Sequence, residues 1–216
     1  LPPRPPRAAL GLPDHAVVLC CFNQIYKLSP HMLDLWSRIL AGAPRAVLWM
    51  LAWNPHAKEN LLRELAARGI AAERVFFGNK LDLPNHIARL RAADLFLDTW
   101  PCNAHTTASE ALWAGVPVLT VPGQTFASRV AASLVAACGL GDLACRNEDD
   151  YVELATALAN EPETLQGLKA HLDVNRRSLP LFDAELLARD MDALLTRMHE
   201  RQLAGLAPEA LEAKPR

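Results

Sequence analysis

The sequence predicts an α/β fold with a doubly wound parallel sheet, and two observations support this prediction. Between residues 16 and 138, apolar runs alternate five times with amphipathic segments. The runs are continuously apolar, a pattern typical of strands that are buried on both faces of a parallel sheet. Such alternation indicates strand–helix–strand units with right-handed crossovers, whose ligands bind outside the carboxyl ends of the strands.

Each element follows from its local pattern. The expected strands are the apolar runs at residues 16–22, 46–52, 74–77, 94–98 and 117–121. Helices are expected where apolar residues recur every three or four positions, as Leu33, Trp36 and Leu40 do in the first helix. The expected crossover helices are residues 30–41, 57–68, 83–92, 106–114 and 128–138. The amphipathic stretch after Leu143 predicts three further helices, at residues 149–159, 162–177 and 183–203.

The two ends of the chain depart from this pattern. Residues 1–14 contain five prolines, which remove amide donors and fix φ. We therefore expect a linker without regular hydrogen-bonded structure, entering from a missing N-terminal region. Residues 15–182 are expected to form the globular lobe, and residues 183–216 a C-terminal helix with a frayed tail. On this interpretation the chain is part of a longer protein.

Composition excludes several classes of protein. A net charge of −2 with scattered Lys and Arg gives no electrostatic footprint for a nucleic-acid partner. The chain has no apolar run of about eighteen residues, so we expect no membrane partner. Its five cysteines are odd in number and lie mostly in apolar stretches, which indicates a reducing, cytoplasmic location rather than a disulfide framework.

The most informative motif is the predicted strand-to-helix junction at His105, Thr106 and Thr107. The free N–H groups and positive dipole end of a helix attract phosphate at such a point. Simple helix capping by threonine is the alternative. Cys102 and His105 have a metal-ligand spacing, but no second Cys/His pair accompanies them, so we expect no metal.

Two other loops are expected at the same rim of the sheet. Gln24 and Lys27 follow the first strand, so Lys27 can direct its charge at a phosphate bound near Thr106. A solvated loop lysine is the alternative. His86 and Arg89 form an i, i+3 pair at the mouth of this rim, where a base or sugar edge can meet them; a plain surface pair is the alternative.

Four segments carry a family resemblance: residues 21–27, 97–107, 112–117 and 122–133. They resemble the C-terminal half of the catalytic region of O-linked N-acetylglucosamine transferases, inverting glycosyltransferases of the GT-B fold, and in particular a bacterial homologue. The resemblance implies a Rossmann-like, nucleotide-sugar-binding lobe. It also implies transfer of a sugar, N-acetylglucosamine first among the candidates, from a UDP-sugar donor to Ser or Thr of a protein acceptor.

The resemblance further implies the donor site. The implied diphosphate ligands are Gln24, Lys27, His105, Thr106 and Thr107, with His86 and Arg89 beside the nucleobase and phosphate and Glu110 at the ribose. Lys27 would stabilise the departing diphosphate, which removes the need for a catalytic metal or other cofactor. Two departures leave the sugar and the base open, because Glu110 stands where the family has Asp and Leu83 where it has a base-side Lys.

The rest of the family's machinery is expected outside this chain. The N-terminal lobe, the proposed histidine base and the tetratricopeptide repeats that hold protein acceptors are absent from the sequence. The lobe alone is therefore expected to be inactive. Two other functions stay open at this point: a non-catalytic nucleotide-binding or protein-interaction module, and another GT-B enzyme such as an epimerase.

Overall fold

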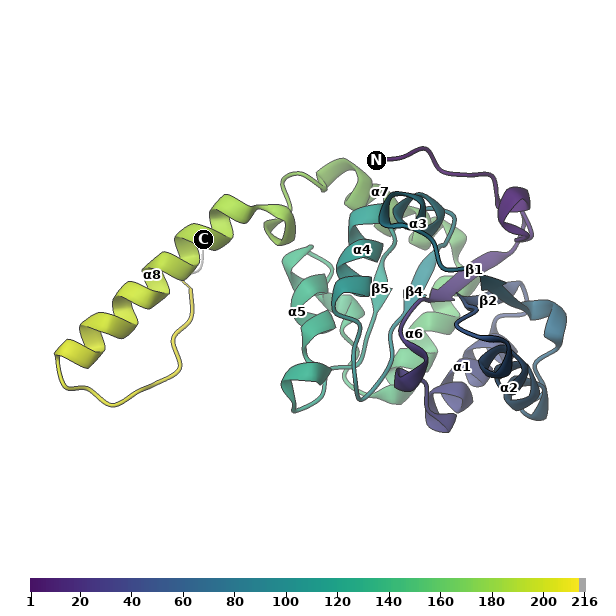
Figure 1. Cartoon of the computed structure of the whole chain (residues 1–216), viewed down its shortest axis with the longest axis horizontal. Coiled ribbons are helices and arrows are strands. Elements are labelled where there is room, and N and C mark those ends of the chain that lie inside the picture. The colour runs from purple at the N-terminus through teal and green to yellow at the C-terminus, as the bar shows by residue number, and fades with distance from the viewer. Residues whose placement is uncertain (214–216) are drawn as a thin grey trace. The chain divides into compact units, whose positions relative to one another are not determined.

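The doubly wound parallel sheet is confirmed by the computed structural model, which describes residues 1–213 (Figure 1). The strands of this part of the chain are β1 (Val17–Cys21), β2 (Ala46–Leu51), β3 (Val75–Gly78), β4 (Leu95–Leu97) and β5 (Val118–Leu119). They form one sheet in the order β3-β2-β1-β4-β5, and every neighbouring pair is parallel. Each strand lies within a residue or two of its predicted position.

The helices also begin and end close to their predicted bounds. They are α1 (Pro30–Gly42), α2 (Pro55–Ala67), α3 (Leu83–Leu90), α4 (Thr106–Ala114), α5 (Val130–Ala137), α6 (Glu148–Asn160), α7 (Pro162–Asn175) and α8 (Ala184–Leu203). The first three begin at Ser29, Asn54 and Asp82, whose side chains accept hydrogen bonds from backbone N–H groups three residues later. In each of them a proline follows at the first or second helical position, where it costs no hydrogen bond.

The order of the strands creates the crevice in which a ligand is expected. The chain moves outward from β1 to β2 and β3, then returns to β4 and β5 on the other side of β1. Because the crossovers are right-handed, α1 and α2 cover one face of the sheet and α3 and α4 the other (Figure 1). The direction of winding therefore changes between β1 and β4, and such a point opens a crevice at the carboxyl ends of the strands.

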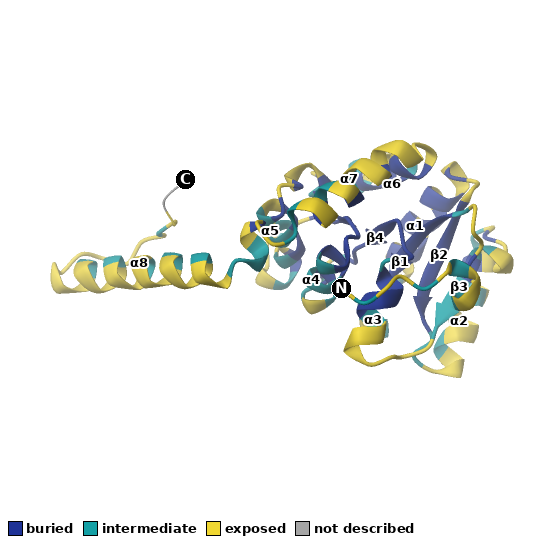
Figure 2. Ribbon diagram, turned by 90° about the horizontal axis from the view of Figure 1, so that it is seen from above, coloured by how far each residue is buried: buried dark blue, intermediate teal, exposed yellow. Residues whose placement is uncertain are grey.

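The core lies between these helices and the sheet. All residues of β1, β2 and β4 are buried, and Figure 2 shows these strands in dark blue between helices with exposed outer faces. Trp36 and Trp49 are fully buried. The Trp36 indole donates to the Tyr151 hydroxyl (3.2 Å), which in turn donates to the backbone oxygen of Asp98 (3.0 Å). This chain of bonds connects the core to the end of β4.

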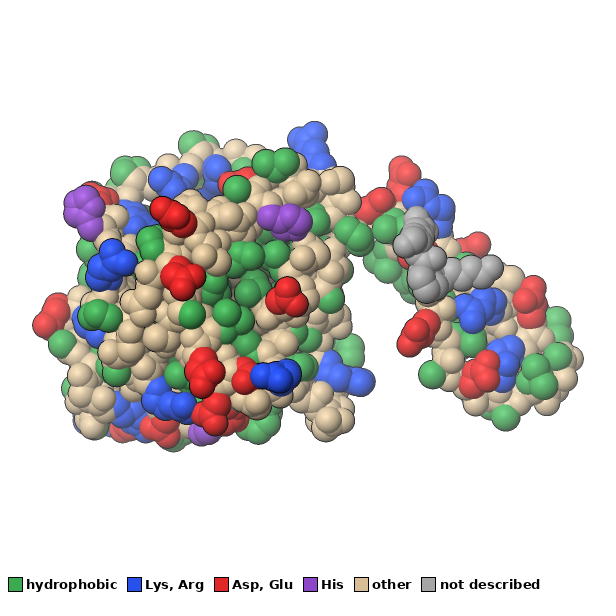
Figure 3. Space-filling view, turned by 180° about the vertical axis from the view of Figure 1, so that it is seen from behind, with side chains coloured by type: hydrophobic (Ala, Val, Ile, Leu, Met, Phe, Trp, Pro, Cys, Tyr) green, Lys and Arg blue, Asp and Glu red, His purple; other side chains and the backbone are tan. Residues whose placement is uncertain are grey.

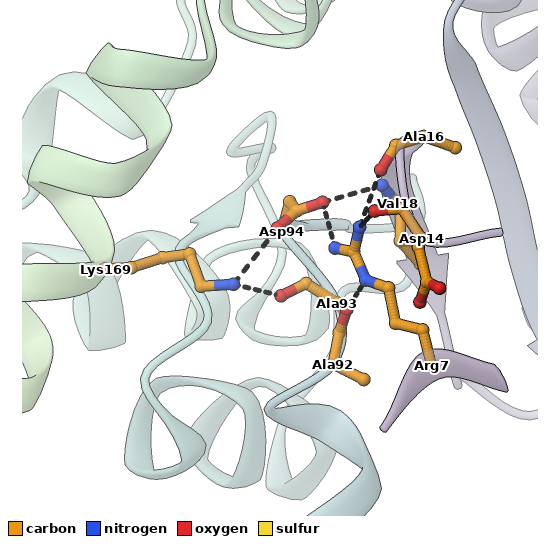
Figure 4. Close-up of polar contacts among 8 residues, drawn as sticks. All are labelled: Arg7, Asp14, Ala16, Val18, Ala92, Ala93, Asp94 and Lys169. Atoms are coloured by element: carbon orange, nitrogen blue, oxygen red, sulfur yellow. Dashed lines mark hydrogen bonds and ion pairs between the residues drawn. The ribbon is translucent and has the colours of Figure 1, made fainter. Parts of the chain in front are cut away.

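The N-terminal segment was expected to lack regular hydrogen-bonded structure, and this expectation is wrong. Arg7–Leu10 forms a hydrogen-bonded 3-10 helix within the predicted linker. Arg7 donates to one carboxylate oxygen of Asp94 (2.6 Å), which also accepts the Val18 N–H (2.8 Å) (Figure 4). Lys169 of α7 donates to the other oxygen (3.1 Å). The prolines prevent a longer helix, yet one arginine suffices to anchor the segment at the amino ends of β1 and β4.

The chain divides into two compact units, the first being Leu1–Arg176 and the second beginning at Arg177. The second unit holds a short 3-10 helix, Pro180–Phe182, and α8, which exposes Leu187, Met191, Leu195 and Met198. Figure 3 shows apolar side chains on the surface of this unit. Residues 206–213 form neither helix nor strand, and the end of the predicted tail, residues 214–216, lies outside the described residues. In the described part of the chain, no helix combines the length and apolarity needed to cross a bilayer.

Candidate functional site

The candidate site lies at the carboxyl ends of β1 and β4. After β1, residues 22–24 lead into the 3-10 helix Ile25–Lys27, and after β4 residues 98–105 lead into α4. Cys20 and Phe96 pair across the two strands, so the loops that follow begin side by side. The Lys27 ammonium group donates to the backbone oxygen of Asn103 (2.6 Å). The structure thus places Lys27 against the loop that precedes the Thr106 helix start.

The start of α4 presents unpaired backbone donors. His105 is the N-cap residue and its side chain makes no capping bond, while its carbonyl accepts from Ala108 and Ser109. Within residues 1–213, no acceptor takes the N–H groups of Thr106 and Thr107. Simple threonine capping is therefore wrong for this helix, since both threonines are helical residues. Free amides at the positive end of a nine-residue helix favour an anion.

A buried polar network that the sequence reading missed supports this helix start. Asp98 accepts hydrogen bonds from the Ala104 N–H (2.6 Å), the Thr120 hydroxyl (2.7 Å) and the Asn23 amide (3.2 Å). Asn23 in turn accepts the Thr107 hydroxyl (2.5 Å). Asn23 and Asp98 are the first polar residues after β1 and β4, which was the available signal. The Thr107 hydroxyl group is therefore already hydrogen-bonded to a buried residue of the protein.

Burial sets the electrostatics of this network. Removal from water raises the pKa of Asp98 to about 7, and the hydrogen bonds from Thr120, Ala104, Thr99 and Asn23 oppose that rise. The carboxyl group accepts the Ala104 N–H in the loop that leads into α4.

Lys27 carries a charge that the protein does not neutralise. Among residues 1–213, no carboxylate forms an ion pair with Lys27, whose contact with the protein is the carbonyl of Asn103. The Asn103 side chain donates to the Thr99 carbonyl (2.9 Å), and its own amide oxygen is buried without a partner in the described residues. An unneutralised ammonium group half-buried at this rim is suited to a phosphate.

The remaining predicted diphosphate ligands differ in how firmly they are held. The exposed side chains of Gln24 and Thr106 have no hydrogen-bond partner in the described part of the chain. His105 has its ring nitrogen Nε2 3.3 Å from the Ala127 carbonyl, and its ring meets Phe126 edge to face at 5.9 Å. The loop after β5 therefore orients His105, while Gln24 and Thr106 are free to meet a ligand.

His86, Arg89 and Glu110 form a second group, where α3 meets α4. Arg89 is only 3% exposed, so the surface-pair alternative is wrong for it. Its guanidinium group donates to His86 Nδ1 (3.1 and 2.8 Å) and to the carbonyl of Asn79, and burial lowers the pKa of the guanidinium. His86 Nε2 lies 3.4 Å from a carboxylate oxygen of Glu110. Only His86 and Glu110 of this group retain partial exposure.

A metal site has no further support from the geometry. Across residues 1–213, no three His, Cys, Asp or Glu side chains gather closely enough to hold an ion. A metal-free reaction stays a prediction. In Figure 3, acidic and basic side chains are interspersed over the face shown.

Comparisons with known proteins agree with the fold. Residues 5–191 match the sequence model of glycosyl transferase family 41. The chain is 37% identical over 200 residues to the UDP-N-acetylglucosamine–peptide N-acetylglucosaminyltransferase of Caenorhabditis elegans, covering 93% of the chain and 17% of that protein. It is 34% identical over 207 residues to the probable UDP-N-acetylglucosamine–peptide N-acetylglucosaminyltransferase SEC of Arabidopsis thaliana, covering 95% of the chain and 21% of that protein.

A solved structure gives the same result. The O-GlcNAc transferase of Thermobaculum terrenum, solved as a mutant, superposes with a TM-score of 0.80 at 34% identity. The match covers 88% of this chain and 38% of that one. The chain spans about a fifth of the length of the two curated relatives, at 17% and 21%.

Proposed function

Because the chain belongs to glycosyl transferase family 41, we propose that it is the donor-binding lobe of an inverting glycosyltransferase. The donor is a UDP-sugar, UDP-N-acetylglucosamine first among the candidates, and the acceptor is Ser or Thr of a protein. The names of the two curated relatives support the donor and the peptide acceptor. Membership of a transferase family also disfavours the epimerase alternative.

One observation carries the proposal: an unneutralised cation contacts the loop that leads into a helix with unpaired amides. Lys27 reaches the loop residue Asn103, three positions before Thr106, whose N–H has no acceptor in residues 1–213. A diphosphate bound here would receive a full positive charge from one side and backbone donors from the other. The exposed side chains of Gln24 and Thr106 supply further donors.

The same arrangement provides the chemistry of a leaving group. When the sugar leaves, negative charge develops on the phosphate oxygen that it leaves behind. Donors that are fixed in place before the reaction stabilise this charge without reorganisation, and removing one typically costs about 3–4 kcal/mol of transition-state stabilisation. Lys27 and the amides of α4 do here what a divalent cation would do elsewhere, so the proposal includes no metal.

The remaining residues divide into direct and indirect roles. Gln24, Lys27, His105 and Thr106 surround the diphosphate, whereas Thr107 contributes its backbone N–H while its hydroxyl holds Asn23. Glu110 lies one helical turn further along α4, and His86 of α3 lies next to it; we assign both to the nucleoside end. The catalytic base and the acceptor site belong to parts of the enzyme other than this lobe. Turnover by the lobe alone is not expected.

Binding measurements on the 216-residue chain test the proposal. Calorimetry should show weak binding of UDP at millimolar ligand, weaker binding of uridine, and competition between inorganic pyrophosphate and UDP. Adding a metal chelator should leave the UDP affinity unchanged. Absence of heat with UDP would reject the donor site, and chelator sensitivity would reject the metal-free part alone. Sugar transfer to a protein by the complete enzyme then separates a transferase from a non-catalytic binding module.

A further inference from the structure

We propose that Asn103 is a positioning residue for Lys27, which it holds in place for catalysis without touching a ligand itself. This inference rests on the proposed function, because it concerns the cation that stabilises the leaving group. Asn103 lies in the loop between β4 and α4 and is fully buried. It therefore acts on the reaction through its neighbours.

The polar groups of Asn103 join the loop that precedes α4 to the loop that follows β5. Its backbone N–H donates to the carbonyl of Ala127 (2.9 Å). Its side-chain amide donates to the carbonyl of Thr99 (2.9 Å) and to the carbonyl of Val121 (3.4 Å). Both the backbone and the side chain of Asn103 are thus held, and the position of its own carbonyl group is fixed by these bonds.

The side-chain amide of Asn103 has one favourable orientation. Its NH₂ group faces two carbonyl oxygens, whereas its amide oxygen is buried without a partner in the described residues. Exchanging the nitrogen and the oxygen would place an acceptor against two acceptors, so the two donated bonds decide the orientation. The protein leaves one buried oxygen unpaired while it keeps the bonds that hold this loop.

The carbonyl group of Asn103 holds the charge of Lys27 without neutralising it. Lys27 Nζ donates to this oxygen over 2.6 Å, between residues 76 positions apart in the sequence. A carbonyl group is a neutral dipole, so it orients an ammonium group and leaves its positive charge in place. A carboxylate at the same point would satisfy that charge before the reaction. The charge of Lys27 therefore stays available for the negative charge that develops on the leaving group.

A double-mutant cycle in the complete transferase tests this role. Asn103→Ala removes both side-chain donors and should lower kcat by about tenfold, with a smaller change in KM for the donor, because a displaced cation loses mainly transition-state stabilisation. In the Lys27→Ala background, Asn103→Ala should lower kcat no further. An unchanged kcat of the single variant, or losses that multiply in the double variant, would overturn the proposal.

Asn160→Ala is the matched control for the loss of an asparagine side chain. Asn160 is exposed, and its side-chain amide donates to the carbonyl of Gly42, which lies far from Lys27 in the sequence. The variant should leave kcat unchanged. A loss equal to that of Asn103→Ala would show a general effect of such substitutions and would overturn the proposal.

A spectroscopic measurement on the 216-residue chain keeps the test decisive if Asn103→Ala does not fold. Lysine-selective ¹H–¹⁵N NMR spectra of the unliganded wild-type chain should show slow hydrogen exchange at Lys27 Nζ, because this group is hydrogen-bonded. The exposed Lys80 should exchange fast, and the signal missing from Lys27→Ala identifies Lys27. In folded Asn103→Ala, the exchange rate of Lys27 should approach that of Lys80.

The exchange measurement also separates this proposal from the proposed function. Equally fast exchange of Lys27 and Lys80 in the wild-type chain would overturn the positioning role, whatever the kinetic data show. Failure of the wild-type chain to bind UDP would reject the proposed function, while the exchange rate would still decide whether Asn103 holds Lys27.

Discussion

The hydroxyl group of Thr107 donates to the side-chain oxygen of Asn23 over 2.5 Å. This bond joins the first turn of α4 to the loop that follows β1, two segments 84 residues apart in the sequence. Asn23 is buried and also donates to Thr99 (2.8 Å). The start of α4, where the candidate phosphate site lies, is therefore hydrogen-bonded to the buried loop that follows β1.

Thr107→Val should lower the free energy of unfolding by about 1–3 kcal/mol, because it leaves a buried acceptor of Asn23 without its donor. Thr107→Ser keeps the hydroxyl group and should retain most of that stability. Urea unfolding followed by circular dichroism measures both changes. Equal stability of the Val and Ser variants would show that this hydroxyl group does not support the helix start.

Lys27→Ala should reduce turnover of the complete transferase by about 10²–10³-fold, because one charged donor to the leaving group is lost. The fold should remain intact, since Lys27 is only half-buried and has no ion pair in the described residues. Steady-state kinetics and a thermal melt measure the two effects. Arg63→Ala removes an exposed cation from α2 and is the control for a general change of charge. Near-normal turnover of Lys27→Ala would remove Lys27 from the mechanism.

The elements of the fold could be predicted because their signals are local. Continuous apolar runs marked the strands, and Ser29, Asn54 and Asp82 cap helices close to where the periodicity began. The start of α4 at Thr106 was predicted to the residue, because a polar loop there separates a buried strand from a helix. These features depend on neighbours within a few positions, which the sequence displays directly.

The supporting network could not be predicted in the same way. Asn23 and Asp98 meet only because β1 and β4 are adjacent in the sheet, a pairing that joins segments 75 residues apart. The burial of Arg89 was missed for a related reason, since an i, i+3 pair with His86 occurs equally on exposed helix faces. Arg7 binds Asp94 from within a proline-rich segment whose composition indicated no fixed structure.

Arg7→Met should destabilise the chain by about 2 kcal/mol, because Asp94 keeps Lys169 as a partner but loses a second charged hydrogen bond. Residues 1–14 should also become easier to cleave, since Arg7 holds them at the amino ends of the strands. Unfolding in urea and limited proteolysis measure these effects. Arg4→Met removes an exposed arginine of the same segment and should leave both properties unchanged. Equal proteolysis of the two variants would contradict an anchoring role for Arg7.

The ionisation of Asp98 should make stability depend on pH. Burial raises its pKa in the folded protein to about 7, whereas the unfolded carboxyl group titrates near 3.8. Between these values the folded state binds more protons than the unfolded state, so this group's contribution to stability is complete below about pH 4 and is lost as the pH rises to about 7.

Asp98→Asn is the variant that isolates this effect. The Asp98→Asn variant should be less stable than the wild-type chain at every pH. The N–H groups of its new side-chain amide face other donors, which are the backbone N–H groups of Ala104 and Thr99 or the hydroxyl group of Thr120. The informative quantity is therefore the slope of unfolding free energy against pH between about 4 and 7, which should be less negative in Asp98→Asn than in the wild-type chain. Urea unfolding at several pH values measures it. An unchanged slope would mean that Asp98 is ionised throughout this range, held so by its four hydrogen-bond donors.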